Sequence, residues 1–110
     1  MGKRETMYLE EVADRDICVL RVKGELDFDQ RKDFSERVEE LLAVSQKRLV
    51  VDLTGTRRLF SVFLGSMVDV HQRAEAAGKT LTVLASERVG HLFEQANLTS
   101  VLNVVVVGSE

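Results

Sequence analysis

The segment KRLVVDLTG, residues 47–55, restricts the fold of this chain more than any other feature. Its apolar residues form a short continuous run, which is typical of a strand that is buried on both faces in a parallel or mixed sheet. Another strand is expected at 79–85, where the sequence reads KTLTVLA. Because such strands are covered by helices, the chain is expected to be an α/β protein.

Three further strands are expected from shorter patterns. The sequence ICVLRVKG places Cys18, Leu20 and Val22 on one face, which is the alternation of a half-buried strand. The polar ADRD before it, at 13–16, predicts a hairpin turn. These three strands are expected at 6–11, 17–23 and 101–107.

Three helices are expected between the strands, because apolar residues recur there at helical spacing among charged ones. The helices are predicted at 29–46, 61–78 and 86–98. Ser86 is a candidate N-cap for the last of them, and Gly78 is a candidate C-terminal cap for the second. The stripe of the first helix consists of Phe34, Val38, Leu41 and Leu42, and that of the third consists of Val89, Leu92, Phe93 and Ala96.

The predicted order of elements is therefore β-β-α-β-α-β-α-β. Right-handed crossovers would join the later strands, so the fold class is α/β, with one mixed central sheet of four to five strands and three to four helices. A single domain is expected over 6–107, because a chain of 110 residues can bury a core without disulfides or metal. Residues 1–5 are taken as a flexible N-terminus.

The composition argues against nucleic acid and membranes as partners. A net charge of only -3, with 30% charged and 45% hydrophobic residues, is the balance of an ordinary globular protein without a basic stripe. No apolar segment approaches the length of a membrane span, and the first residues do not resemble a signal peptide. The single Cys18 cannot form an internal disulfide. We expect a cytoplasmic protein that does not insert into a membrane.

The sequence lacks the recognisable motifs of an enzyme. It has no Gly-rich phosphate loop, no Ser/His/Asp signature and no carboxylate-rich metal site. His71 and His91 fall on different predicted helices, without other ligands at metal-binding spacing. We therefore expect no catalytic residue, no cofactor and no metal.

Four segments together indicate a family. They are KGELD after the second strand, LVVDLTG as the third strand, the serine-bearing turn with LG, and ERVGHLFEQANLTSVLNV near the end. In one register over residues 6–107, the chain closely resembles the bacterial STAS domain of anti-sigma factor antagonists. The resemblance implies a cytoplasmic protein that binds a kinase-type anti-sigma factor and so releases a sigma factor. In that family the partner kinase phosphorylates a serine at the head of the second helix, which switches the antagonist off.

The phosphorylation motif of the family is degenerate in this chain. The family sequence is Asp-Ser-Ser-Gly-Leu-Gly, and the second serine is the usual acceptor. The register set by LG places Val62 at the acceptor position, Phe60 at the aspartate and Phe63 at the first glycine. Ser61 is left as a weak candidate acceptor. The partner-binding residues implied are Asp27, Arg57, Arg58, Phe60, Ser61, Val62, Phe63 and Ser66.

Helical spacing predicts where these side chains point. With about 3.6 residues per turn, Val62, Ser66, Asp69 and Arg73 share one face of the second helix, opposite its apolar stripe. We therefore expect Val62 to face solvent at a helix N-terminus, where a phosphate would have been favourable. Valine has no oxygen to phosphorylate. The hypothesis is that the turn at 56–63 binds a partner constitutively.

Some of these residues also have ordinary structural interpretations. Ser61 is a good N-cap for the second helix. Phe60 and Phe63 could be core or half-buried packing residues, as large aromatic residues usually are in a small domain. Arg57 and Arg58 could be a solvated pair or could bind acidic groups of a partner.

Asp27 has two compatible interpretations. It could cap the first helix, in competition with Asp29, and it could also contribute a partly exposed carboxylate to the partner surface.

A second function class is also compatible with the STAS resemblance. STAS proteins also resemble the small cytosolic accessory subunit that braces the ATPase of a bacterial lipid-transport ABC system. In both cases the partner is a protein, either an anti-sigma factor or a transporter ATPase. The sequence leaves open whether the chain also forms a homodimer.

Overall fold

The computed structural model describes residues 6–12, 16–45 and 47–108. The predicted N-terminal segment 1–5 and most of the predicted hairpin at 13–16 lie outside the described residues. The strands are β1 Met7–Val12, β2 Ile17–Leu26, β3 Arg48–Leu53, β4 Thr56–Leu59, β5 Thr80–Ala85 and β6 Asn103–Val106. The helices are the 3-10 turn η1 Phe28–Gln30 and the α-helices α1 Arg31–Val44, α2 Val62–Ala76 and α3 Glu87–Gln95.

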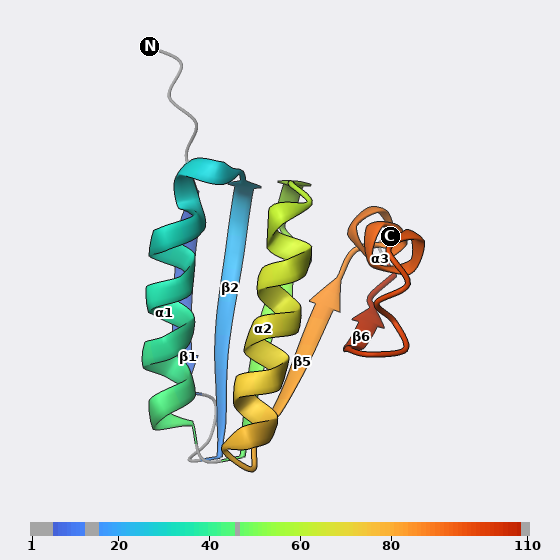
Figure 1. Cartoon of the computed structure of the whole chain (residues 1–110). Helices are drawn as coiled ribbons and strands as arrows, with labels where there is room; N and C mark the ends of the chain where they lie inside the picture. The colour runs from blue at the N-terminus through green and yellow to red at the C-terminus, as the bar shows by residue number, and fades with distance from the viewer. Residues whose placement is uncertain (1–5, 13–15, 46, 109–110) are drawn as a thin grey trace.

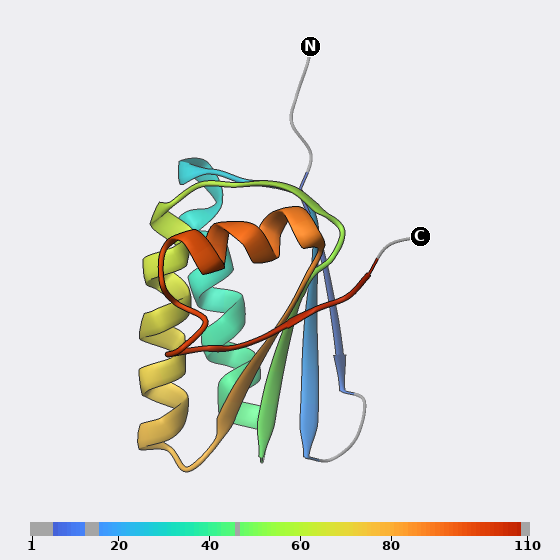
Figure 2. The same cartoon turned by 90° about the vertical axis from the view of Figure 1, so that its right-hand side faces the viewer.

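These elements form one mixed sheet with helices packed on it. The strand order is β1-β2-β3-β5-β6, in which β1 is antiparallel to β2 and the other neighbours are parallel. Helices α1 and α2 lie side by side on one face of the sheet, and α3 lies near β5 and β6 (Figures 1 and 2). The predicted α/β class is confirmed, with six strands among the described residues instead of four to five.

The additional strand is β4, which pairs in parallel with the second half of β2. The first half of β2 pairs with β3. After the turn at Thr54 and Gly55, the chain pairs with β2 again, this time as β4. Thr56 is anchored there, because its buried hydroxyl donates a hydrogen bond to the carbonyl of Val22 at 2.9 Å. The predicted turn at 56–63 is therefore wrong over its first half. From Leu59 the chain crosses the top of the molecule to reach α2 (Figure 2).

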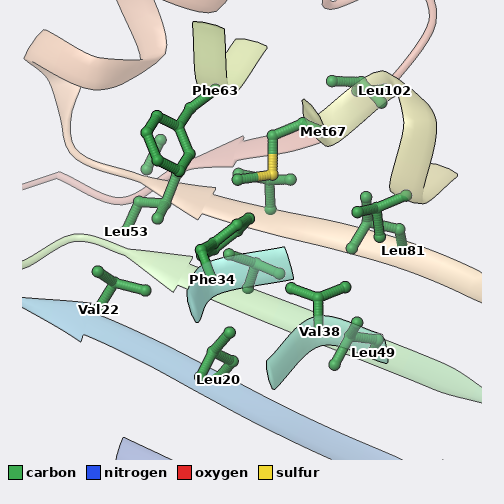
Figure 3. Close-up of a cluster of buried hydrophobic side chains, with 14 of the residues drawn as sticks. Leu20, Val22, Phe34, Val38, Leu49, Leu53, Phe63, Met67, Leu81 and Leu102 are labelled. Atoms are coloured by element: carbon green, nitrogen blue, oxygen red, sulfur yellow. The ribbon is translucent and has the colours of Figure 1, made fainter. Parts of the chain in front are cut away.

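The hydrophobic core lies between the sheet and the helices (Figure 3). Its fully buried large side chains are Leu20, Val22, Leu26, Phe34, Val38, Leu49, Val51, Leu53, Phe63, Met67, Val83 and Phe93. The prediction that β3 is buried on both faces is wrong, because Val50 and Asp52 are partly exposed. Among the described residues, no helix covers that second face of the sheet (Figure 2).

The predicted helix ends are confirmed in part. The Oγ of Ser86 accepts a hydrogen bond from the N–H of Val89 at 3.3 Å, so Ser86 caps α3. Gly78 follows α2 with a φ of 75°, which suits a C-terminal cap. The stripe predicted for α3 is narrower than expected: Leu92 is only half-buried, and Ala96 is exposed because α3 ends at Gln95.

Candidate functional site

The candidate site surrounds the first turn of α2, at the carboxyl end of the parallel strands. Backbone hydrogen bonds fix the approach to the helix: the N–H of Phe60 donates to the carbonyl of Leu26 at 3.0 Å, and the N–H of Phe63 donates to the carbonyl of Phe60 at 2.9 Å. Ser61 stands at the N-cap position but makes no side-chain capping bond, so the capping role predicted for its hydroxyl is wrong. Its side chain is exposed.

Two aromatic side chains are exposed at this end of the molecule. Phe60 is 44% exposed and lies under the guanidinium of Arg58, at 5.9 Å from the ring centroid. Phe28 is 67% exposed and lies under Arg31 in the same way, at 5.8 Å. Phe60 is therefore not a core residue, although part of its surface is covered. Exposed aromatic and arginine side chains are typical of protein interfaces.

Four arginines at this end have no carboxylate partner among the described residues. We call them the head arginines; they are Arg31, Arg57, Arg58 and Arg88. Arg31 and Arg58 lie over aromatic rings, and Arg88 Nη1 donates to the carbonyl of Arg57 at 3.5 Å. By contrast, Arg21, Arg37 and Arg73 each lie within 3.3 Å of a carboxylate. The head arginines are therefore available to pair with acidic groups of another protein.

Two of the residues implied by the family are buried beneath this surface. Phe63 is 0% exposed, so it supports the site from the core and does not face solvent. Asp27 is 5% exposed, which corrects the expectation of a partly exposed carboxylate. Its Oδ1 accepts from the N–H of Asp29 at 3.0 Å, and Gln30 Oε1 accepts from the N–H of Asp27 at 2.9 Å. This capping box shows that Asp27, and not Asp29, caps η1.

Val62, the first residue of α2, is half-buried and packs on the edge of the core. The expectation that it faces solvent holds only in part, because the core and α1 cover some of its side chain. Val62 and Ser66 instead line a groove of about 380 Å³ between α1 and α2, together with Arg31, Phe34, Ser35, Val38, Gly65, Asp69, Val70 and Arg73. The Ser66 hydroxyl donates to the carbonyl of Val62 at 3.2 Å.

Among the described residues, no group of three His, Cys, Asp or Glu side chains is placed to hold a metal ion. Cys18 is buried in the core, and this burial raises the pKa of its thiol. Among the helices of the described residues, none is long and apolar enough to cross a bilayer.

A protein-family comparison identifies the chain. The family model described as "Mlab, STAS domain" matches residues 10–106. The chain belongs to the STAS domain family. A comparison with curated proteins finds no significant match.

Several solved structures share the fold. An anti-sigma factor antagonist from Mycobacterium paratuberculosis superposes with a TM-score of 0.83 at 20% identity, covering 92% of this chain and 86% of that chain. The anti-sigma factor antagonist SpoIIAA in its unphosphorylated form gives 0.76 at 16% identity, over 94% and 89%. The Bacillus cell fate determinant SpoIIAA in the phosphorylated form gives 0.71 at 15% identity, over 94% and 92%.

Proposed function

We propose that this STAS domain is a regulatory protein-binding module in the cytoplasm that acts as an anti-sigma factor antagonist does. Its partner would be a kinase-type anti-sigma factor or a similar protein, and it would bind without catalysing a reaction. Family membership and the named structural neighbours support this assignment. The observation that carries it is the set of head arginines without carboxylate partners beside the exposed Phe60.

The proposed binding surface follows the approach to α2. It includes Arg57, Arg58, Phe60 and Ser61, which are exposed, and the half-buried Val62. Acidic groups of a partner would pair with the arginines, while its apolar groups would cover Phe60 and Val62. Ser66 would contribute from the groove, whereas Asp27 and Phe63 would hold the surface in place from below.

We further propose that binding is not switched by phosphorylation at the usual position. Val62 occupies that position and has no hydroxyl. Ser66 lies one turn further along α2, where its hydroxyl bonds the carbonyl of Val62. Ser61 is exposed but is not the acceptor position of the family motif. The partner would therefore bind constitutively.

A pull-down with three baits tests this proposal: the wild type, Val62→Asp and Val62→Asn. Both variants lose the packing of Val62, but only Val62→Asp places a negative charge beside the partner's acidic groups. We expect Val62→Asp to weaken binding by about 1–2 kcal/mol more than Val62→Asn does. Equal capture by all three baits would contradict the proposed surface. Incubating the wild type with ATP and a captured kinase should leave its mass unchanged, whereas a phosphate on Ser61 or Ser66 would refute constitutive binding.

The identity of the captured protein separates the two function classes. An anti-sigma factor would support the proposal. Capture of a transporter ATPase instead would replace it with the accessory-subunit function.

A further inference from the structure

Gly65 lies in α2 although neither its backbone conformation nor its contacts require glycine. It is the fourth residue of the helix and is exposed. Its backbone does not need glycine, because the glycines with positive φ are Gly24 and Gly78. A Cβ built at Gly65 meets no atom within 4 Å. Since glycine weakens a helix relative to alanine, Gly65 lowers the stability of α2, and no contact in the described structure compensates for this loss.

The surroundings of Gly65 indicate what it leaves room for. It lines the groove between α1 and α2, which run side by side (Figure 1). The lining of the groove combines the small side chains Ser35 and Ser66 with apolar side chains such as Val62 and Val38. Because the serine side chains are small, the main chain of another protein could approach this part of the groove closely.

The charges at the two ends of the groove differ. Arg31 stands at the end near η1 and makes no ion pair with any described residue. At the other end, Arg73 is already paired with Asp69 at 3.0 Å and with Glu39. An occupant should therefore present a negative charge at the Arg31 end only.

We propose that this groove receives a segment of the partner protein, in addition to the contacts at the other three head arginines, Arg57, Arg58 and Arg88. The main chain of that segment would pass against Gly65, an apolar side chain would cover Val62, and an acidic side chain would pair with Arg31. This inference rests on the proposed function and extends its binding surface along α2.

Stability measurements on the protein alone provide the first test. Gly65→Ala should unfold at the same denaturant concentration as the wild type or at a higher one, because the added methyl group meets nothing. A lower midpoint would show that the fold itself requires Gly65, and it would overturn the inference.

Binding measurements provide the second test, with the protein captured by the wild-type bait, once purified, as the probe. Gly65→Leu fills the groove, whereas Gln72→Leu adds the same side chain to an exposed position of α2 that does not line it. We expect Gly65→Leu to weaken binding about tenfold or more and Gln72→Leu to change it by less than about twofold. Binding of Gly65→Leu at wild-type affinity would overturn the inference.

The binding of Arg58→Glu and the oligomeric state of the protein show which proposal fails, that of the groove, of the binding surface or of the partner. If Arg58→Glu weakens binding while Gly65→Leu does not, the groove proposal fails and the proposed function stands. If neither variant alters binding, the proposed surface fails as well. If light scattering shows a wild-type dimer that Gly65→Leu converts to a monomer, the occupant is a second copy of this chain and the partner assignment is wrong.

Discussion

Phe63 packs edge-on against Phe34, with ring centroids 5.4 Å apart and planes inclined by 79° (Figure 3). Both rings are fully buried, so this contact joins the first turn of α2 to α1 inside the core. It holds Val62 and Arg31 on opposite walls of the groove. The position of the proposed binding surface therefore depends on this aromatic pair.

Truncating the pair should destabilise the fold strongly. Phe63→Ala and Phe34→Ala should each lower the free energy of unfolding by about 3–5 kcal/mol, because each leaves a cavity in a packed core. The double variant should lose less than the sum of the two, by about 0.5–1.5 kcal/mol, because the rings contact each other. Denaturant unfolding of all four proteins measures this coupling, and strict additivity would show that the ring contact contributes nothing.

Capping of η1 should depend on Asp27 and not on Asp29. Asp27→Ala removes the acceptor of the capping box and should lower the free energy of unfolding by about 1–2 kcal/mol. Asp29→Ala is the matched control, because its backbone N–H still bonds Asp27 and its own side chain caps nothing. Equal losses in the two variants would be evidence against the capping box.

Tyr8 should titrate unusually late. Its hydroxyl is buried without a hydrogen-bond partner among the described residues, and the Arg37 guanidinium lies 4.6 Å from the ring centroid. Burial, with a smaller contribution from Asp33, raises the pKa of Tyr8 from 10.0 to about 12, although Arg37 opposes the shift. Because the chain has one tyrosine and no tryptophan, the ultraviolet absorbance of tyrosinate reports Tyr8 alone.

The sign of the effect on stability follows from this shift. The folded state holds the Tyr8 proton more tightly than the unfolded state does. The contribution of Tyr8 to the stability of the fold is therefore fully present below pH 10.0 and is lost as the pH rises toward about 12. Absorbance titrations in buffer and in denaturant should give a higher midpoint for the folded protein. Coincident midpoints would rule out the burial of this hydroxyl.

Periodicity predicted those features of the fold that depend on neighbours in sequence. The stripe Phe34, Val38 and Leu41 is buried in α1, and the alternation of Cys18, Leu20 and Val22 is present in β2. These patterns are set by helix and strand geometry, so a sequence contains them directly.

Features that depend on distant segments could not be predicted in this way. Val62 heads the polar face of its own helix, but α1 covers part of it. Strand β4 has only four residues, two of them arginines, and it forms because β2 extends beyond β3 and offers it an edge. Phe28 and Arg88 at the candidate site went unpredicted, because neither belongs to the family motif and only the fold brings them to the same end of the sheet.

Whether a partner binds around the first turn of α2 can be measured directly as the affinity of the purified partner for Arg58→Glu and for Arg48→Glu. Both arginines are exposed and make no ion pair among the described residues, but Arg58 flanks Phe60 and Arg48 begins β3 at the opposite end of the sheet. We expect Arg58→Glu to raise the dissociation constant about tenfold or more and Arg48→Glu to change it by less than about twofold. Equal dissociation constants for the two variants would show that the partner does not bind around the first turn of α2.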